Sequence, residues 1–188
     1  PQSASLRHVF FAERTAGKIA RAKGAKPLPL RHIGIVGGGN MGAGIATACL
    51  QAGLSVTMVE RDENAFCDGL KRVDSAIGKA CSIGKMSKTE ADVAKEAFRG
   101  GTDYSNLGDC DLVIEAVFED MGVKKDVFAK LDAATRSNTV LATNTSYLDV
   151  DEIAKAVNDP TRVIGLHFFS PAHVMKLLEV IVTAKASA

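Results

Sequence analysis

A histidine and a glutamate stand in two neighbouring apolar runs near the end of the chain. His167 interrupts the run VIGLHFF, and Glu179 interrupts the run LLEVIV. If these runs are antiparallel strands joined by a turn centred on residue 173, residue 167 pairs with residue 179 and the carboxylate faces the imidazole. Such an acid fixes which ring nitrogen carries the proton and favours the imidazolium, so His167 could accept a proton from a substrate. The alternative is a core histidine with no chemical role.

A glycine-rich turn near the start of the chain predicts a dinucleotide site. In IGIVGGGNMGAGIA, the spacing Gly37-x-Gly39-x-x-Gly42 follows a strand-like run and opens a helical one. The glycines allow a tight turn, a close approach of backbone to a pyrophosphate and close helix–strand packing, while free N–H groups at the helix start face the anion. The next run, LSVTMVE, ends in Glu60, near the roughly twenty residues expected for a carboxylate that binds the adenosine ribose. Glu60 favours NAD over NADP, although Arg61 beside it could meet a 2′-phosphate.

Polar residues after later strand-like runs complete a candidate site. Glu119 and Lys124 follow DLVIEAVF, and Ser146 follows TVLAT. Glu119 and Lys124 could hold the cofactor ribose, or they could form an exposed ion pair in the first turn of a helix. Ser146, His167 and Glu179 could form a hydrolytic triad, but the serine does not lie in a G-x-S-x-G turn. We therefore favour alcohol oxidation, in which the histidine takes the hydroxyl proton, the serine binds the substrate oxygen and hydride passes to the nicotinamide.

The elements that must position these residues alternate between strand and helix. The strand-like runs are HIGIV, LSVTMVE, DLVIEAVF, TVLAT, VIGLHFF and LLEVIV, and helical patterns lie between them. This alternation predicts a Rossmann-type, doubly wound α/β fold with a mostly parallel sheet. The roughly fifty residues between Glu60 and Asp111 are long enough for a helical hairpin, whose second helix opens with the capping box Ser87-Lys88-Thr89-Glu90. The hairpin could form a wall of a substrate cleft or simply cover the core.

The first thirty residues differ from the rest. Residues 3–22 read as a helix, and GAKPLPL after them reads as a linker, so we expect residues 1–30 to be a surface helix and linker and 31–188 to be the dinucleotide-binding domain. The chain begins at Pro1 without an initiator methionine. We therefore expect a fragment of a longer protein.

Composition limits the remaining choices. A chain of 188 residues fits one ordinary domain, and 23 basic against 22 acidic side chains give no electrostatic reason to expect nucleic-acid or membrane binding. Four widely spaced cysteines without C-x-x-C suggest neither a metal site nor a disulfide framework, and they favour a reducing compartment. No signal peptide or membrane-spanning run is visible.

Several stretches resemble one family. GGGNMGAGIA, DLVIEAVFEDMGVKKDVF, VLATNTSYLDVDEIA and RVIGLHFFSPAHVMKLLEVI are similar to the NAD-binding domain of 3-hydroxyacyl-CoA dehydrogenases. The resemblance implies oxidation of L-3-hydroxyacyl-CoA to 3-ketoacyl-CoA with NAD, in fatty-acid β-oxidation. By motif position it assigns catalysis to His167, Glu179 and Ser146. It assigns cofactor binding to Met41, Glu60, Glu119 and Lys124, and also to Ser146. The CoA-binding residues of the hairpin are not clearly matched, because Ala76 and Ile83 stand near the expected positions.

The motif HFFSPAHVM is similar to that of multifunctional enzymes that join this activity to an enoyl-CoA hydratase. The leading FFAERTAGKIA resembles the helix and linker that join the two parts in such enzymes, which implies that residues 1–30 come from a preceding domain. The resemblance implies a hydratase domain and a C-terminal helical domain in the parent protein, the latter absent from this chain. It further implies weak or no turnover by the chain alone, and a bacterial cytoplasmic or a peroxisomal location. A non-catalytic dinucleotide-binding module and a dehydrogenase of small hydroxy acids remain as alternatives.

Overall fold

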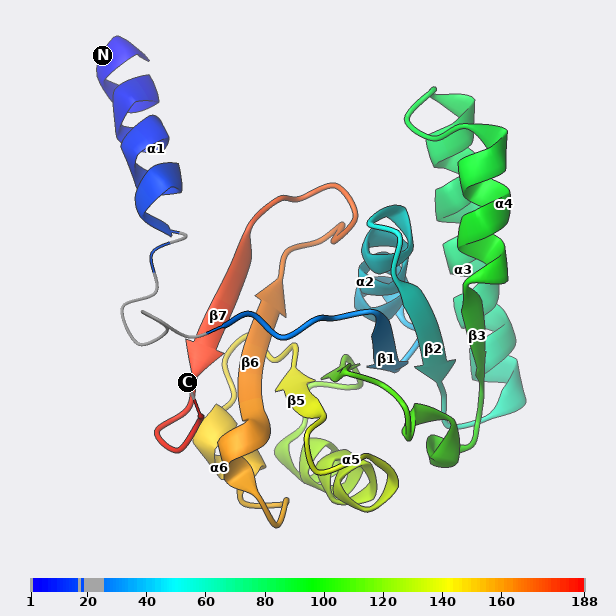
Figure 1. The fold of residues 1–188 in the computed structure, drawn as a ribbon, viewed down its shortest axis with the longest axis vertical. Coiled ribbons are helices and arrows are strands. Elements are labelled where there is room, and N and C mark those ends of the chain that lie inside the picture. Colours follow the sequence, from blue (N-terminus) through cyan, green and yellow to red (C-terminus); the bar gives the residue numbers. More distant parts are fainter. Residues whose placement is uncertain (1, 17, 19–25, 188) are drawn as a thin grey trace.

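A seven-stranded sheet organises the computed structural model, which describes residues 2–16, 18 and 26–187 (Figure 1). The strands are β1 (His32–Val36), β2 (Ser55–Val59), β3 (Phe98–Gly101), β4 (Leu112–Glu115), β5 (Val140–Thr143), β6 (Val163–Phe168) and β7 (Leu178–Val182). The helices are α1 (Gln2–Ala16), α2 (Asn40–Gln51), α3 (Glu63–Ser82), α4 (Lys88–Glu96), α5 (Met121–Ala134) and α6 (Val150–Ala154), with 3₁₀ turns η2 (Tyr104–Leu107) and η3 (Pro160–Arg162).

The strand order is β3-β2-β1-β4-β5-β6-β7. The first six strands run parallel, and β7 runs antiparallel to β6. From β1 the chain adds β2 and then β3 on one side of the sheet. It then crosses back and adds β4 on the other side of β1, so the strand order reverses between β1 and β4. Ligands of open α/β sheets bind at the carboxyl ends of the strands where the order reverses. The predicted Rossmann-type fold is confirmed, and β1 and β4 flank the expected crevice.

Helices cover both faces of the sheet and create two apolar clusters. On one face, α2, α3 and α4 pack against residues such as Ile35 and Ile114. On the other face, α5 and α6 pack against residues such as Val113 and Leu141. Successive side chains of a strand point to opposite faces, so the apolar runs of β1, β4 and β5 supply both clusters.

The structure corrects two strand predictions. The run DLVIEAVF was expected to remain a strand through Phe118, but β4 ends at Glu115 and Phe118 is 78% exposed. Glu115 pairs with Val36 and Thr143, which are the last residues of β1 and β5, so the run loses its neighbours at this point. The short strand β3 was not predicted, because its sequence FRGG is neither apolar nor alternating.

The predicted helical hairpin is confirmed as α3 and α4, which extend beyond the sheet at the β2–β3 edge (Figure 1). The capping box is also present, since the Ser87 hydroxyl accepts from the Glu90 N–H and the Glu90 carboxylate accepts from the Ser87 N–H. The helix expected over residues 3–22 is present as α1, which ends at Ala16. Lys18 is not helical, which contradicts the expectation there, and residues 17 and 19–25 lie outside the described residues. None of the helices in the described part of the chain has both the length and the apolar character needed to cross a membrane.

Candidate active site

His167 and Glu179 face each other across β6 and β7, as the sequence predicted. They are direct partners in the antiparallel register, and 2.8 Å separates His167 Nδ1 from Glu179 Oε2. A carboxylate only accepts hydrogen bonds, so Nδ1 carries the hydrogen and Nε2 of the neutral ring keeps its lone pair. The Phe169 ring lies against the imidazole, with 4.6 Å between the ring centroids. The imidazole is therefore held from two sides with one nitrogen left to accept a proton.

The glycine turn connects β1 to α2 and leaves open space at Gly39. Gly37 has φ of +98°, which favours glycine. A Cβ at Gly42 would lie 1.7 Å from the Gly37 carbonyl oxygen, so this glycine permits the close contact between helix and strand. A Cβ at Gly39 would meet nothing within 4 Å, and no side chain caps the helix that begins after it. The first N–H groups of α2 can thus receive a phosphate. Met41, in the first turn, is half-buried against the core.

Glu60 follows β2 and holds the glycine turn. Its Oε1 accepts from the Gly38 N–H at 2.6 Å, and its Oε2 accepts from the Arg61 N–H at 3.0 Å. Arg61 turns its guanidinium toward Asp62, with 3.1 Å between Nε and Oδ2. The carboxylate of Glu60 therefore stands at the glycine turn, where it would disfavour the 2′-phosphate of a bound NADP.

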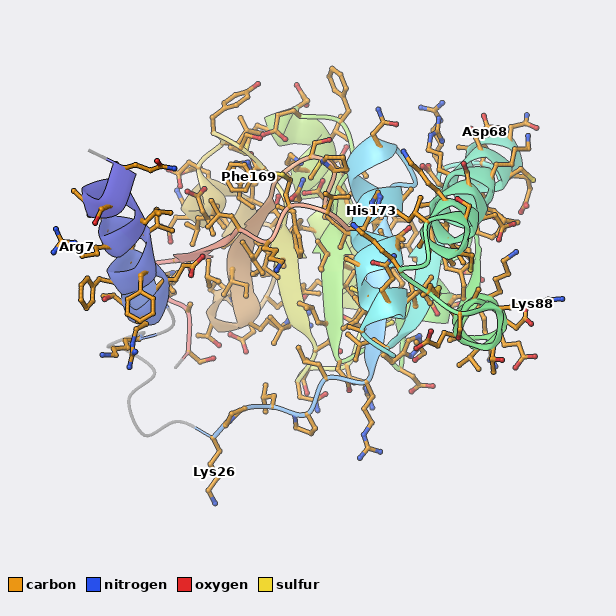
Figure 2. The ribbon with its side chains drawn as sticks, turned by 90° about the horizontal axis from the view of Figure 1, so that it is seen from above. Arg7, Lys26, Asp68, Lys88, Phe169 and His173 are labelled. Carbon is orange, nitrogen blue, oxygen red and sulfur yellow. The ribbon has the colours of Figure 1, made fainter. Side chains whose placement is uncertain are left out.

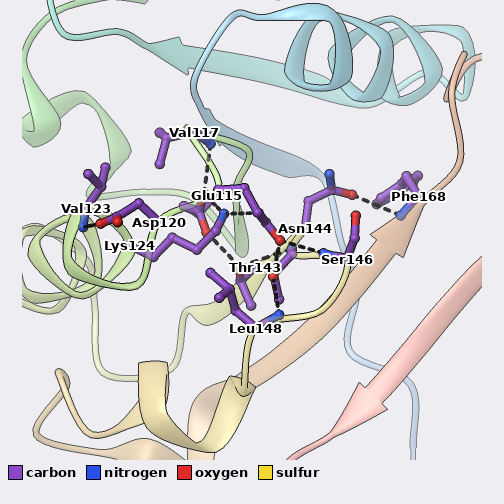
Figure 3. A network of polar contacts seen from close by, with 12 residues as sticks. Glu115, Val117, Asp120, Val123, Lys124, Thr143, Asn144, Ser146, Leu148 and Phe168 are labelled. Atoms are coloured by element: carbon purple, nitrogen blue, oxygen red, sulfur yellow. Dashed lines mark hydrogen bonds and ion pairs between the residues drawn. The ribbon is translucent and has the colours of Figure 1, made fainter.

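Glu119 follows β4 and Ser146 follows β5, and the two residues are in contact. Figure 3 shows Ser146 within a network of polar contacts that includes Lys124 and Thr143. The Ser146 N–H donates to Glu119 Oε1 at 2.8 Å, and the Thr145 hydroxyl donates to the same oxygen. Burial, the largest single influence, raises the pKa of Glu119, but the hydrogen bonds from Thr145, Ser146 and Lys124 outweigh it and hold the pKa below its usual value. The Ser146 hydroxyl is exposed and makes no hydrogen bond to the residues that the structure describes, so it is free to bind a ligand.

Lys124 is a buried cation between two carboxylates. Its side chain is 1% exposed, and its Nζ lies 3.1 Å from Glu119 Oε2 and 2.7 Å from Glu115 Oε1. The alternative of an exposed ion pair is therefore wrong. Glu115 was missed in the sequence, although it is a lone acid within an apolar run, which is the same signal that identified His167 and Glu179.

Asn144 links the Ser146 turn to the histidine strand. Its Oδ1 accepts from the Phe168 N–H at 2.9 Å, and Phe168 directly follows His167. Within the described residues no hydrogen bond joins His167 to Ser146, so the arrangement is not that of a hydrolytic triad. Glu119 contacts both Lys124 and Ser146. His167 lies at the end of the adjoining strand β6, and Glu60 lies on the far side of β1, after β2. Asn144 was not selected as a site residue from the sequence.

A cleft of about 1240 Å³ lies between α2, the α3–α4 hairpin and the loop that follows β6. Four basic side chains contribute to its lining, namely Lys71, Arg72, Lys79 and Lys85. The loop contributes Ser170 and His173, and His173 lies beside α2 in Figure 2. The hairpin therefore lines a cleft, and it also covers the core through residues such as Val73 and Ile77, so both features expected of it are present.

Comparisons with known proteins agree with this arrangement. Residues 32–188 match the family described as 3-hydroxyacyl-CoA dehydrogenase, NAD binding domain. The chain is 44% identical over 96% of its length to the human peroxisomal bifunctional enzyme. It is 38% identical over 97% of its length to the peroxisomal fatty acid beta-oxidation multifunctional protein AIM1 of Arabidopsis thaliana. The chain spans 25% and 26% of the length of these two relatives.

A solved structure gives the same result. The (S)-3-hydroxybutyryl-CoA dehydrogenase PaaH1 from Ralstonia eutropha has a TM-score of 0.82 and 34% sequence identity to this chain, and the alignment covers 85% of the chain and 56% of that protein. The family match over residues 32–188 includes the sheet, the glycine turn and the strand that carries His167. The chain therefore belongs to the 3-hydroxyacyl-CoA dehydrogenase family, as its NAD-binding domain.

Proposed function

We propose that this chain is the NAD-binding part of an enzyme that oxidises L-3-hydroxyacyl-CoA to 3-ketoacyl-CoA in fatty-acid β-oxidation. The observation that carries the proposal is the 2.8 Å contact between His167 Nδ1 and Glu179 Oε2, on a strand whose end is tied to the turn that bears Ser146. A proton acceptor and a free hydroxyl at the carboxyl edge of a dinucleotide-binding sheet suit the oxidation of an alcohol.

In the proposed reaction, His167 Nε2 takes the proton of the substrate hydroxyl. Glu179 stabilises the imidazolium that results and keeps the ring in one orientation. The exposed hydroxyl of Ser146 binds the substrate oxygen and holds it near the imidazole. In the reverse direction His167 returns the proton to the ketone oxygen.

The residues present fit NAD. The open space at Gly39 and the uncapped start of α2 suit a pyrophosphate, and Glu60 stands where the adenosine ribose would be bound. Glu119 and Lys124, with Ser146 beside them, would hold the nicotinamide end on the other side of β1. When bound, NAD supplies the acceptor for the hydride that leaves the carbinol carbon.

The cleft beside the hairpin favours an acyl-CoA over a small hydroxy acid. A volume of about 1240 Å³ is far larger than a small acid needs, and four basic side chains in its lining suit the phosphates of CoA. The loop after His167 forms one side of the cleft, so a substrate that filled the cleft could extend toward the imidazole. We propose that Lys71, Arg72 and Lys79 bind the CoA phosphates.

We further propose that the parent protein joins this domain to a hydratase domain before it and a helical dehydrogenase domain after it. The relatives named above are called bifunctional and multifunctional, and they are several times longer than this chain. In α1 the large apolar side chains Leu6, Val9, Phe10 and Phe11 are 50–64% exposed, as expected for a helix that packs on another domain. Both relatives are peroxisomal by name, so we propose a peroxisomal location, with the bacterial cytoplasm as the alternative.

The experiment that tests the proposal compares substrates in the full-length parent. With NAD present, L-3-hydroxybutyryl-CoA should be oxidised, whereas free 3-hydroxybutyrate should neither react nor compete with it. Oxidation of the free acid at a comparable kcat/KM would contradict the acyl-CoA assignment. The 188-residue chain alone should bind NADH but turn over acetoacetyl-CoA weakly or not at all, and full steady-state activity would contradict the need for a further domain.

A further inference from the structure

Glu115, the last residue of β4, is a fully buried carboxylate that the proposed chemistry does not use. Its Oε1 accepts from Lys124 Nζ at 2.7 Å and from the Val117 N–H at 2.8 Å. Its Oε2 accepts from the Thr143 hydroxyl at 2.6 Å. An ionised carboxylate is retained in a protein interior when charge and hydrogen bonds compensate its lost hydration, and Glu115 has both.

Two routes lead from Glu115 to the turn that carries Ser146 (Figure 3). In the first, Glu115 binds Lys124, Lys124 binds Glu119, and Glu119 accepts from the Ser146 N–H. In the second, the Thr143 hydroxyl that donates to Glu115 lies 3.3 Å from the Thr145 N–H and accepts from it. Both routes end in the turn after β5, so Glu115 holds that turn against β4.

The charges in this network explain why Lys124 needs both carboxylates. If Glu115 carried no charge, the buried cation would have Glu119 as its remaining anionic partner among the described residues. Coulomb attraction is strong where water is excluded, so Lys124 would draw Glu119 closer and weaken the hydrogen bonds of Glu119 to Thr145 and Ser146. Glu115 therefore keeps Glu119 available to the Ser146 turn.

We propose that Glu115 is a positioning residue for the nicotinamide end of the cofactor site, acting through Lys124 and Thr143. The inference rests on the proposed function, in which Glu119, Lys124 and Ser146 hold that end. The effect should be local, because no hydrogen bond or ion pair among the described residues joins Glu60 or Gly39 to Lys124, Thr143 or Glu119. Glu115 also accepts from the Val117 N–H, and Val117 lies beside Gly37 of the glycine turn, but a glutamine at position 115 keeps an amide oxygen that can accept from this N–H. A residue that served only to stabilise the core would affect both ends alike.

The test measures binding of NADH and of ADP to the 188-residue chain and to Glu115→Gln by titration calorimetry. ADP carries the adenosine and pyrophosphate but no nicotinamide. In Glu115→Gln the Kd for NADH should rise about tenfold while the Kd for ADP changes less than about twofold. Unchanged NADH binding, or equal weakening of both ligands in a folded variant, would overturn the proposal.

Two further variants keep the result interpretable. Thr143→Val keeps the shape of the side chain and the charges of Glu115 and Lys124, but it removes the hydroxyl of the second route. The Kd for NADH should therefore rise about threefold while the Kd for ADP stays the same. An unchanged Kd for NADH in this variant would contradict the inference. Asp132→Asn is the matched control, because Asp132 forms a largely buried ion pair with Arg162, which directly precedes β6, whereas Glu115 is the last residue of β4. Asp132→Asn should lower the free energy of unfolding and leave the Kd for NADH and the Kd for ADP unchanged. The test needs no substrate, so the proposal for Glu115 can fail while the dehydrogenase assignment stands. The dehydrogenase assignment can likewise fail in the substrate comparison while the proposal for Glu115 stands.

Discussion

Glu179 lies directly opposite His167 across β6 and β7, and its Oε2 accepts from the imidazole Nδ1 at 2.8 Å. The pairing follows from the antiparallel register, in which each side chain of one strand faces a side chain of the next. The glutamate is 55% exposed and the histidine 20% exposed, so the pair lies at the surface of the site, where a substrate can reach the ring.

Replacement of Glu179 by glutamine should slow catalysis without loss of cofactor binding. The amide cannot stabilise the imidazolium as the carboxylate does, so we expect kcat of the full-length parent to fall about 100-fold, with the Kd for NADH unchanged. Steady-state kinetics and NADH fluorescence titration measure the two quantities. Glu152→Gln, which removes an ion-paired glutamate on α6, is the control and should leave both unchanged. An unaltered kcat in Glu179→Gln would contradict the role of the pair.

Gly39→Ala should separate cofactor binding from folding. A Cβ at this position meets open space and the backbone φ of −65° suits alanine, so the free energy of unfolding should change by less than about 1 kcal/mol. The methyl group would nevertheless stand where the pyrophosphate must approach, and the Kd for NADH should rise about tenfold.

Gly78→Ala in α3 is the control for this substitution, because its Cβ also meets open space but lies away from the turn. It should stabilise the helix by about 0.5–1 kcal/mol and leave NADH binding unchanged. Chemical denaturation and calorimetry provide the measurements. Equal NADH affinity in Gly39→Ala and the wild type would mean that the pyrophosphate does not bind at this turn.

Glu60→Gln should reduce the preference for NADH over NADPH. The carboxylate at the glycine turn repels a 2′-phosphate, and Arg61 is already paired with Asp62. We expect the ratio of the Kd for NADPH to the Kd for NADH to be well above one in the wild type and to fall at least about fivefold in the variant. The ratio is measured by fluorescence titration, and an unchanged ratio would remove Glu60 from cofactor selection.

The depressed pKa of Glu119 predicts a pH-dependent contribution to stability. Its carboxyl has an ordinary pKa of 4.5 and a lower one in the folded chain. The unfolded state thus takes up the proton first as pH falls, so the stabilisation is complete above pH 4.5 and is lost as pH falls through the folded pKa. Glu119→Gln should be less stable than the wild type at pH 7, with a smaller difference at pH 4 and below. Urea denaturation across this range gives the difference, and a difference independent of pH would contradict the assignment.

The fold could be predicted from the sequence where apolar periodicity and turn chemistry agreed. The parallel strands, the glycine turn and the pairing of His167 with Glu179 were all predicted correctly, because each depends on local pattern and simple register. The strand β3 was missed because Phe98–Gly101 pairs with β2 without an apolar pattern of its own. The end of β4 was misjudged because apolar residues after Glu115 continue the run, while the neighbouring strands end.

The candidate site was predicted less completely than the fold. Glu119, Lys124 and Ser146 were selected by their place after strand ends, but the burial of Lys124 depends on Glu115, a partner nine residues earlier in the chain. The contribution of Asn144, which binds the Phe168 N–H, depends on β5 and β6 being neighbours. Spacing alone cannot supply such contacts, because they arise between segments that only the tertiary structure brings together.

The most direct test of the proposed function is His167→Gln in the full-length parent, with two measurements on the same preparation. In the proposed reaction the imidazole binds the substrate and not the nucleotide, so the Kd for NADH should remain within about twofold of the wild type. The kcat for L-3-hydroxybutyryl-CoA should fall at least about 1,000-fold. Retention of the rate with glutamine at this position would contradict the assignment of His167 as the proton acceptor.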